Sequence, residues 1–524
     1  MMKQNRRLVV LFSAILITGS LFGQHTNILV GDSINEFFPE EPCIMLDPQN
    51  PDRLLIGANI DNCYSSDDGG YSWTLNKLTS PYGIWGDPCI VVDSFGSFYF
   101  FHLSDPPGDP WVERIICQKK ETWGDQFHFK EDFGWNNYKI QDKEWATLDR
   151  DNNNIYVAWT QWDSFGTSLP GDSSIIVLSK SENLGETWSE PVRLSEIAGD
   201  CIGEDGTVEG AVPAIGPDNE VYISWAGEQG IYFDKSYDFG ETWLDDDIFV
   251  SDIPGGWYFQ IPGLNKANGM PITDCDISDS QYRGNIYINW SDQRNGTDDT
   301  DIWLVKSTDQ GDTWSTPIRV NDDSPGNQQF LTWMDIDQTN GYIYIVFYDR
   351  RNYTDTNTDV YLAVSMNGGE SFENFKISDA PFIPYSSVFF GDYTNIVAHN
   401  NVVRPVWTRL DGQHLSVWTS IVDLSQVGID NKPKSPVAEI ISYPNPFHET
   451  NFLSYKLLKS SIVNVTVYNN YGDKVCCLID NEKYESGKHI IKFSPDKYQI
   501  LSGVYYFKII ADDMIESQKI IYKD

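Results

Sequence analysis

The chain is poor in basic residues: 37 Lys and Arg stand against 76 Asp and Glu, and the formal net charge is −39. Nucleic acids and anionic membrane surfaces bind through basic patches that neutralise phosphate, so neither is an expected partner. After residue 24, no apolar run approaches the roughly 18 residues that a membrane-spanning helix needs. The sequence therefore predicts no transmembrane segment.

Cysteine and histidine are also sparse. The 8 cysteines form no C-x-x-C pair, and none of the 7 histidines stands at metal-ligand spacing, so no zinc site is predicted. We interpret the cysteines as mostly buried apolar side chains, with a disulfide between Cys201 and Cys275 as an alternative. Glycine, proline and aromatic residues are abundant instead (40 Gly, 26 Pro, 18 Trp, 28 Tyr and 27 Phe), which is typical of many short strands joined by tight turns.

Residues 1–23 are typical of a secretory signal peptide. Lys3, Arg6 and Arg7 precede an apolar run over residues 8–17, and small residues follow before position 24. A buried N-terminal helix is the alternative, but packing does not need this order of charged and apolar residues. We therefore expect an exported protein.

A short motif occurs five times along the chain: Ser, then Asp or Asn two residues later, Gly after two more, and an aromatic residue at the end. Its positions are Ser66, Asp68, Gly70, Trp73, Ser181, Gly185, Trp188, Ser236, Asp238, Gly240, Trp243, Ser307, Asp309, Gly311, Trp314, Ser365, Gly369 and Phe372, with Asn183 and Asn367 replacing the Asp in two copies. Ser and Asp can bond turn backbone, Gly supplies a positive φ, and the aromatic ring packs between sheets. The motif is therefore interpreted as a folding device and not as a catalytic one.

This motif resembles the Asp box, or BNR repeat, of the sialidase-like β-propeller superfamily. The resemblance implies an all-β propeller over residues 24–425. The first interval between copies is about twice the next one, so a degenerate unit around residues 96–123 fits inside it. Seven blades are predicted, with six as the alternative. The last unit lacks an outer strand, and residues 25–30 match that position, so the N-terminal strand is expected to close the ring.

The composition changes after a polar linker over residues 426–440. Residues 441–524 contain short alternating strands that predict a small immunoglobulin-like β-sandwich. The segments 443–447 (YPNPF) and 502–505 (SGVY) resemble the C-terminal sorting domain of type IX secretion cargo. The resemblance implies the type IX machinery as a partner and a secreted or outer-surface location, whereas a carbohydrate-binding module is the alternative.

A functional site is expected on the face opposite the Asp-box turns. Candidate catalytic acids and bases are Glu41, Asp87, Glu144 and Asp292. Candidate ligand-binding residues are Arg294, Arg350, Arg351, Arg409, His102, Asp105, Trp162, Asp163 and Asp392. Acids, arginines and indoles together suit a glycan, because the charged groups bond hydroxyls and the indoles stack on sugar faces. The Asp–Arg pairs have a second interpretation, as braces between blades.

Several functions remain open at this stage. The first is a glycan-binding glycoside hydrolase of the exo-sialidase type, but the arginine that such enzymes place in an R-I-P motif is replaced by residues 41–44 (EPCI). The others are a non-catalytic surface propeller for adhesion or protein binding, and a polysaccharide lyase that would use His102. No cofactor is required, although calcium could bind the acidic loops 297–301 and 354–359. A monomer is expected.

Overall fold

The structure is a computed structural model that describes residues 25–34, 38–108, 111–424, 437–470, 474–498, 500–511 and 514–523. The predicted signal peptide and most of the predicted linker lie outside these ranges. The described residues form strands, one 3-10 helix, η1 (Pro495–Tyr498), and no α-helix, which confirms the all-β prediction. In these same ranges, no helix is long and apolar enough to cross a membrane. The chain divides into two compact units, Met1–Val427 and Gly428–Asp524.

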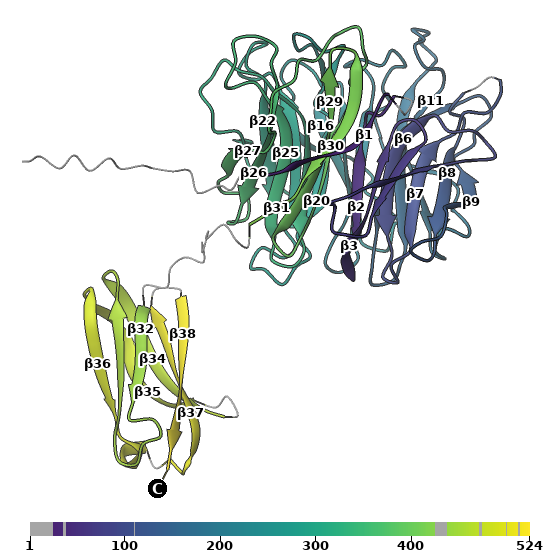
Figure 1. The fold of residues 1–524 in the computed structure, drawn as a ribbon. Helices are drawn as coiled ribbons and strands as arrows, with labels where there is room; N and C mark the ends of the chain where they lie inside the picture. Colours follow the sequence, from purple (N-terminus) through teal and green to yellow (C-terminus); the bar gives the residue numbers. More distant parts are fainter. Residues whose placement is uncertain are drawn as a thin grey trace, which may run out of the picture. The chain divides into compact units, whose positions relative to one another are not determined.

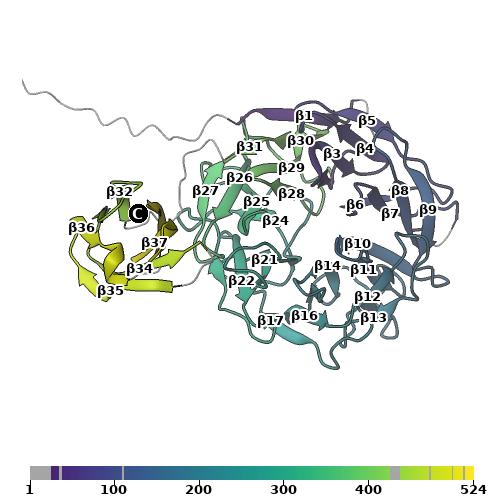
Figure 2. The ribbon, with the colours of Figure 1, turned by 90° about the horizontal axis from the view of Figure 1, so that it is seen from below.

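The first unit is a ring of sheets that follow one another along the chain, which is a propeller arrangement (Figure 2). Its first three consecutive sheets are β2 (Cys43–Asp47), β3 (Asn50–Ala58), β4 (Asn62–Ser66) and β5 (Thr74–Lys77); β6 (Gly86–Val92), β7 (Phe98–Leu103), β8 (Ile115–Lys120) and β9 (His128–Phe133); and β10 (Ile140–Leu148), β11 (Ile155–Trp162), β12 (Ser174–Ser181) and β13 (Val192–Arg193). In each sheet, the strand that comes first in the chain lies nearest the centre of the ring.

The next three sheets repeat this pattern. They are β14 (Glu209–Ile215), β15 (Val221–Gly227), β16 (Gly230–Ser236) and β17 (Ile248–Ser251); β20 (Ile272–Cys275), β21 (Ile286–Asp292), β22 (Asp301–Ser307) and β23 (Ile318–Arg319); and β24 (Gln329–Asp337), β25 (Tyr342–Asp349), β26 (Asp359–Ser365) and β27 (Glu373–Lys376). A two-stranded sheet, β18 (Tyr258–Phe259) with β19 (Ala267–Asn268), lies between two of them in the chain. Strands such as β11 and β21 are buried along their whole length because neighbouring sheets cover both faces.

The last sheet joins the two ends of this unit. It contains β28 (Asn395–His399), β29 (Val402–Asp411), β30 (His414–Ser420), β31 (Val422–Asp423) and β1 (Asn27–Asp32). Strand β1 pairs antiparallel with β30, from Asn27 opposite Ser420 to Asp32 opposite Ser416. The prediction that the N-terminal strand closes the ring is therefore confirmed.

Each Asp box forms the hairpin between the third and fourth strands of its sheet. In the box of β16, the Ser236 hydroxyl donates to Asp238 (2.8 Å) and accepts from the backbone N–H of Gly240 (2.9 Å), whose φ is +76°. The aromatic residue packs on the preceding sheet: Trp188 stacks on Phe133 with ring centroids 4.1 Å apart. Since the strands alternate in direction, these hairpins lie at the end of the ring opposite the starts of the inner strands.

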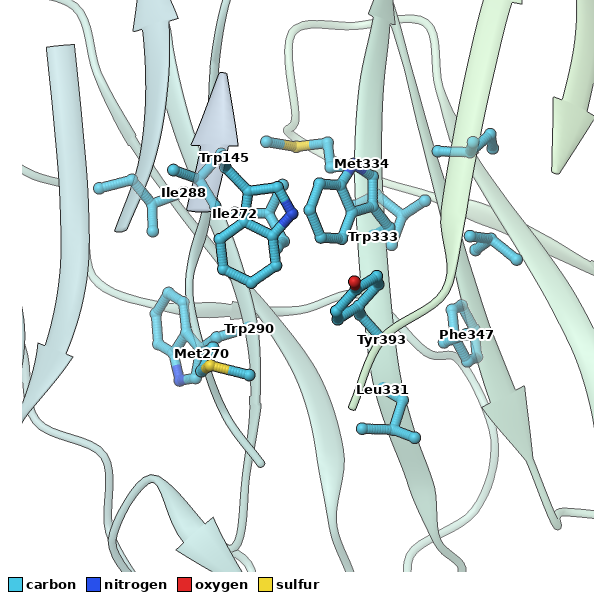
Figure 3. Close-up of a cluster of buried hydrophobic side chains, with 14 of the residues drawn as sticks. Trp145, Met270, Ile272, Ile288, Trp290, Leu331, Trp333, Met334, Phe347 and Tyr393 are labelled. Atoms are coloured by element: carbon cyan, nitrogen blue, oxygen red, sulfur yellow. The ribbon is translucent and has the colours of Figure 1, made fainter. Parts of the chain in front are cut away.

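Large aromatic residues from different parts of the ring pack against one another. The indoles of Trp145 and Trp333 lie 5.4 Å apart between centroids, and Tyr393 packs against both at 5.4 and 6.0 Å (Figure 3). All three side chains are buried. These three side chains therefore form one packed cluster between the inner positions of the ring.

The second unit has a separate hydrophobic core between two sheets (Figure 1). One sheet consists of β32 (Val437–Tyr443), β33 (Asn451–Leu457) and β36 (Gly487–Phe493), and the other of β35 (Lys474–Tyr484), β34 (Ser461–Asn469), β37 (Gly503–Ala511) and β38 (Met514–Tyr522). Phe447 belongs to this core and is bridged to Tyr522 near the end of the chain.

The cysteines take no part in cross-linking. All 8 are free thiols, including Cys201 and Cys275, so the alternative of a disulfide between these two is wrong. Both are buried, as expected of small apolar side chains.

Candidate functional site

A cavity of about 560 Å³ opens where the inner strands begin. Its aromatic lining consists of Phe38, Trp85, Trp111, Phe165, Trp257, Tyr258 and Phe389. Its polar lining consists of Glu40, Glu41, Asn59, Asp87, Asp142, Lys143, Glu209, Lys266, Asn268 and Asp392. This end of the ring lies opposite the Asp-box hairpins, on the predicted face.

Backbone irregularities at the starts of the inner strands position the polar groups. Glu41, Asp87 and Lys143 have φ values of +52°, +52° and +54°, in the left-handed region that side chains rarely adopt. The pairing register shifts at the same places in β6 and β10, which is the sign of a β-bulge. A bulge re-aims a side chain, and here it repeats from sheet to sheet so that three charged groups converge.

Lys143 is the centre of this cluster. Its ammonium lies 3.3 Å from Glu41, 3.1 Å from Asp87 and 3.0 Å from Asp392, and all four side chains are buried. Burial disfavours the charged amine, but the attraction of these acids is stronger and holds the pKa of Lys143 well above its usual value. Lys143 is therefore a permanent cation.

Asp392 has a second cationic partner, Lys266, at 2.7 Å. Burial opposes ionisation of Asp392, yet Lys143 and Lys266 outweigh it and lower the pKa to about 2. Asp392 is therefore ionised at all physiological pH values. Asn268 fixes its backbone by donating to the carbonyl oxygen at 2.8 Å.

Other carboxyl groups of the cluster behave in the opposite way. Burial and the neighbouring Asp142 raise the pKa of Glu209 to about 8, so this group holds a proton at neutral pH. Burial and Asp87 also raise the pKa of Glu41 and of Glu144 well above the usual range. Both carboxyl oxygens of Glu144 lack a hydrogen-bond partner among the described residues. Ionised and protonated acids thus stand side by side.

Aromatic side chains form one wall of the cavity. Trp85 and Trp111 lie 4.7 Å apart between ring centroids, and Phe165 continues the row at 6.5 Å from Trp111. Trp85 is 43% exposed and Phe165 47%, so their faces are available to a ligand. Trp257 is held by a hydrogen bond from its indole N–H to the carbonyl of Thr207 at 3.1 Å.

The predicted catalytic residues are only partly brought together. Glu41 and Asp87 line the cavity together with the predicted ligand residue Asp392, and Glu144 lies in the same charged cluster but not in the described lining. Asp292 is elsewhere: it is fully buried, accepts from the indole of Trp290 at 2.8 Å and pairs with Arg294. It does not belong to the described lining of the cavity, so a catalytic role for Asp292 stays a prediction that this cavity does not support.

Three of the four predicted arginines make the same set of contacts in three different sheets, and none of these contacts involves the cavity. Arg294, Arg351 and Arg409 each pair with an acid two residues away, Asp292, Asp349 and Asp411 respectively, and each covers an aromatic ring of its own sheet. Each also reaches the segment that follows the preceding sheet, at Asp252, Asp322 and Ala380. These arginines are braces between sheets, and they do not form a carboxylate clamp.

Arg350 is also engaged within the fold. It is buried, donates to Thr358 at 3.0 Å and to the carbonyl of Pro262 at 2.7 Å, and covers the ring of Phe330. None of the four arginines belongs to the described lining of the cavity. Their assignment as ligand-binding residues stays a prediction that this cavity does not support.

The remaining predicted ligand residues also lie outside the cavity. His102 is fully buried, with its ring nitrogens bonded to Leu103 and Gln118, and burial lowers its pKa to about 4. Trp162 is fully buried against Phe165, whose other edge meets Trp111. Both nitrogens of His102 are therefore engaged within the fold, and the lyase role of His102 stays a prediction that this cavity does not support.

Asp163 and Asp105 are the last two of the predicted ligand residues. Asp163 pairs with Lys139 at 2.8 Å and accepts from Ser173. Asp105 is exposed, and its backbone N–H donates to Tyr82. Neither residue belongs to the described lining of the cavity.

Sequence reasoning missed the two lysines and most of the aromatic wall. Lys143 directly precedes Glu144 near the start of an inner strand, and this place could have suggested a site residue. In a regular strand, however, neighbouring residues point to opposite faces, so only one of the two was expected at the site. Trp85 directly precedes Gly86 of β6 and could have been found in the same way. Lys266 and Trp257 flank the small β18–β19 sheet, which no repeat indicates.

The acidic loops proposed for calcium are engaged in internal contacts. Asp301 accepts from Asn295, Asn321 and Arg319, and Asp359 accepts from Tyr353 and Ser378. In the part of the chain that the structure describes, no three His, Cys, Asp or Glu side chains are grouped to hold a metal ion.

Comparison with known families identifies the second unit. The family described as the secretion system C-terminal sorting domain matches residues 442–523. These residues are a type IX sorting domain. The sorting domain covers the segment predicted from its sequence motifs and supports secretion or export to the cell surface. No curated protein matches the chain in sequence.

Solved structures resemble the chain weakly. The α-L-arabinanase of Penicillium chrysogenum complexed with arabinobiose is 11% identical, with a TM-score of 0.43 over 76% of this chain and 98% of that one. An ulvan lyase from a family of polysaccharide lyases is 12% identical, with a TM-score of 0.46 over 75% and 95%. YCF48 bound to D1 peptide is 11% identical, with a TM-score of 0.41 over 78% and 99%. Similarity at this level gives no information about the activity of this chain.

Proposed function

We propose that this protein is an exported propeller that binds a glycan in the central cavity. The supporting observation is the combination, in one cavity of about 560 Å³, of an aromatic wall with a cluster of carboxyl groups and lysines. Indole faces stack on sugar rings, and carboxyl groups orient hydroxyls through hydrogen bonds. In this proposal each sheet of the ring is one of seven blades, the protein is a monomer, and the sorting domain is an immunoglobulin-like sandwich that brings the propeller to the cell exterior.

We further propose that the bound glycan is hydrolysed. Glycoside hydrolysis needs a carboxylic acid that donates a proton and a carboxylate that stays ionised. Glu209 has a pKa of about 8 and faces the cavity, which suits the donor. Asp392 lines the same cavity, and its pKa of about 2 suits the carboxylate that stays ionised. A sialidase reaction is not supported, because the arginines are engaged as braces.

The decisive experiment uses the mature full-length protein with a panel of neutral, acidic and amino-sugar polysaccharides. Binding by calorimetry and release of reducing ends are measured in parallel. Trp111→Ala should reduce affinity at least about tenfold, as expected when a buried stacking contact is lost. Tyr71→Ala is the matched control, because Tyr71 is an exposed aromatic residue in an Asp-box hairpin at the other end of the ring.

The two parts of the proposal have separate outcomes. Binding that is weakened by Trp111→Ala, without release of reducing ends from any substrate, would leave a non-catalytic propeller for adhesion. Release that persists unchanged in Glu209→Gln would remove Glu209 as the proton donor. Absence of binding across the whole panel would contradict glycan recognition.

A further inference from the structure

The cavity has far more acidic than basic groups. Its described lining contains six carboxyl groups, Glu40, Glu41, Asp87, Asp142, Glu209 and Asp392, and two lysines, Lys143 and Lys266. Burial raises the pKa of Glu209 to about 8 and holds the pKa of Glu40 and Glu41 well above the usual range, so these acids favour their protonated forms when no cation is present. A cationic ligand would favour their ionised forms, whereas an anionic ligand would oppose them.

Both lysines are already committed to acids of the protein. Lys143 contacts Glu41, Asp87 and Asp392 within 3.3 Å, and Lys266 lies 2.7 Å from Asp392. Lys143 is buried among its three acids, whereas Lys266 keeps about a third of its side chain exposed beside Asp392. A ligand carboxylate or sulfate at Lys266 would lie next to the ionised Asp392, and this repulsion disfavours an anion there.

One acid at the cavity surface lacks a partner for part of its carboxyl group. Glu40 is only 4% exposed, and one of its carboxyl oxygens has no hydrogen-bond partner among the described residues. Burial and the neighbouring Glu41 raise the pKa of Glu40 well above its usual range, as expected where a cation is missing. The oxygen is itself buried, so a donor supplied by the ligand would satisfy it once the carboxyl group turns towards the cavity.

The aromatic residues favour the same kind of ligand. A cation near an aromatic face is stabilised by the ring quadrupole. The protein already uses this contact at the cavity, where Lys266 lies 5.4 Å from the ring of Phe389 and Lys143 lies 5.7 Å from that of Tyr393. Trp85, Trp111 and Trp257 present further faces in the same space.

We infer that the cavity recognises a ligand that carries an ammonium group, and that the glycan is one with free amino sugars. The second half of this inference rests on the proposed function, whereas the first half does not. The ammonium pairs with Glu40 and the facing carboxyl groups, and the rest of the sugar stacks on the indole wall.

The test measures the affinity of the mature protein for three matched hexasaccharides: glucosamine, N-acetylglucosamine and glucose, all β-1,4-linked. At about pH 6 the free sugar amine is protonated. The amino form should bind at least about tenfold more tightly than the other two. Glu40→Gln should remove this preference without affecting the weaker binding of the neutral forms, whereas Glu121→Gln, at an exposed surface position, should change nothing.

A second pair of probes separates the ammonium from the sugar. Butylammonium should quench the fluorescence of the cavity tryptophans and compete with the amino hexasaccharide, whereas butanol should do neither. Equal binding of all three hexasaccharides, or preference for the N-acetyl form, would overturn the inference and leave the proposed function intact. Binding of butylammonium but of no glycan would overturn the proposed function and leave a cation site.

Discussion

Lys143 and Asp392 form a buried ion pair of 3.0 Å between inner positions of two different sheets. Lys143 also contacts Glu41 and Asp87, so a single ammonium joins the starts of four inner strands. A buried charge is strongly destabilising when its partner is removed, because the desolvated charge is left uncompensated. The cluster of Lys143 and its three acids therefore also holds the starts of the inner strands together at this end of the ring.

Replacing Lys143 by Met should lower the free energy of unfolding of the propeller by about 3–5 kcal/mol at neutral pH. The loss should be smaller near pH 4, because the neighbouring carboxyl groups can then be protonated and need no cation. Urea unfolding followed by tryptophan fluorescence measures both values. Lys139→Met is the matched control, since Lys139 pairs with Asp163 at a partly exposed site and should change stability little. Equal losses in the two variants would contradict this account of the cluster.

Arg351→Met distinguishes a brace from a ligand clamp. Asp349 is fully buried, so removal of Arg351 should cost about 3–5 kcal/mol of stability. Ligand affinity of the folded fraction should stay unchanged, because Arg351 is not among the described residues around the cavity. Lys77→Met serves as the control, because its pair with Asp61 leaves both side chains more than a third exposed. Loss of affinity with unchanged stability would restore the clamp interpretation.

The Asp box predicts an ordered series of stabilities. Ser236→Ala leaves the buried N–H of Gly240 without its acceptor and should cost about 1–3 kcal/mol. Asp238→Asn should remain close to the wild type, because Asn183 fills the same position in its own box and accepts from Ser181 and from the backbone of Thr187. Thermal unfolding of the two variants checks the order. A larger loss in Asp238→Asn than in Ser236→Ala would show that the negative charge, and not the hydrogen bond, matters.

Removal of the sorting domain should abolish export. A chain that ends before residue 437 should accumulate inside cells that possess type IX secretion, whereas the full chain should reach the medium or the surface. The propeller has its own core and should remain folded, which protease resistance of the trapped protein can verify. Secretion of the truncated chain at the wild-type level would contradict the assignment.

Features that depend on local chemistry could be predicted from the sequence. The Asp box combines Ser, Asp and Gly within five residues, so its turn follows from short-range bonds and needs no knowledge of the rest of the chain. The closing strand was predictable because the last unit lacks an outer strand and residues 25–30 match the sequence at that position. The sorting domain was predictable because its motifs are dense within a short segment.

Residues of the site could be predicted only where the sequence also predicted the start of an inner strand. Glu41, Asp87, Glu144 and Asp392 were found because each lies near the start of an inner strand. Lys143 was missed because simple alternation sends it away from Glu144, and the bulge with φ +54° that re-aims it depends on pairing with β11. The arginines were assigned to the site because the sequence does not distinguish an arginine that pairs with a neighbouring acid from one that binds a ligand.

Glu209 should make the free energy of unfolding depend on pH, and this dependence can be measured without knowing the ligand. Burial and Asp142 raise its pKa to about 8 in the folded protein, from an ordinary value of 4.5. Between pH 4.5 and about pH 8, the folded state keeps a proton that the unfolded chain has lost. The contribution of Glu209 to stability is therefore fully present below pH 4.5 and decreases as the pH rises to about 8. The decrease is at most about 1.4 kcal/mol per pH unit for one proton.

Glu209→Gln should remove this contribution, because the amide does not ionise. The difference in unfolding free energy between the variant and the wild type should therefore shift in favour of the variant between about pH 5 and pH 8, and it should level off above pH 8 once Glu209 is ionised in both states. Glu186→Gln, at an exposed position, is the control and should show no such shift. A difference that stays constant over this range would mean that Glu209 is ionised at neutral pH, and a general acid at this position would then be untenable.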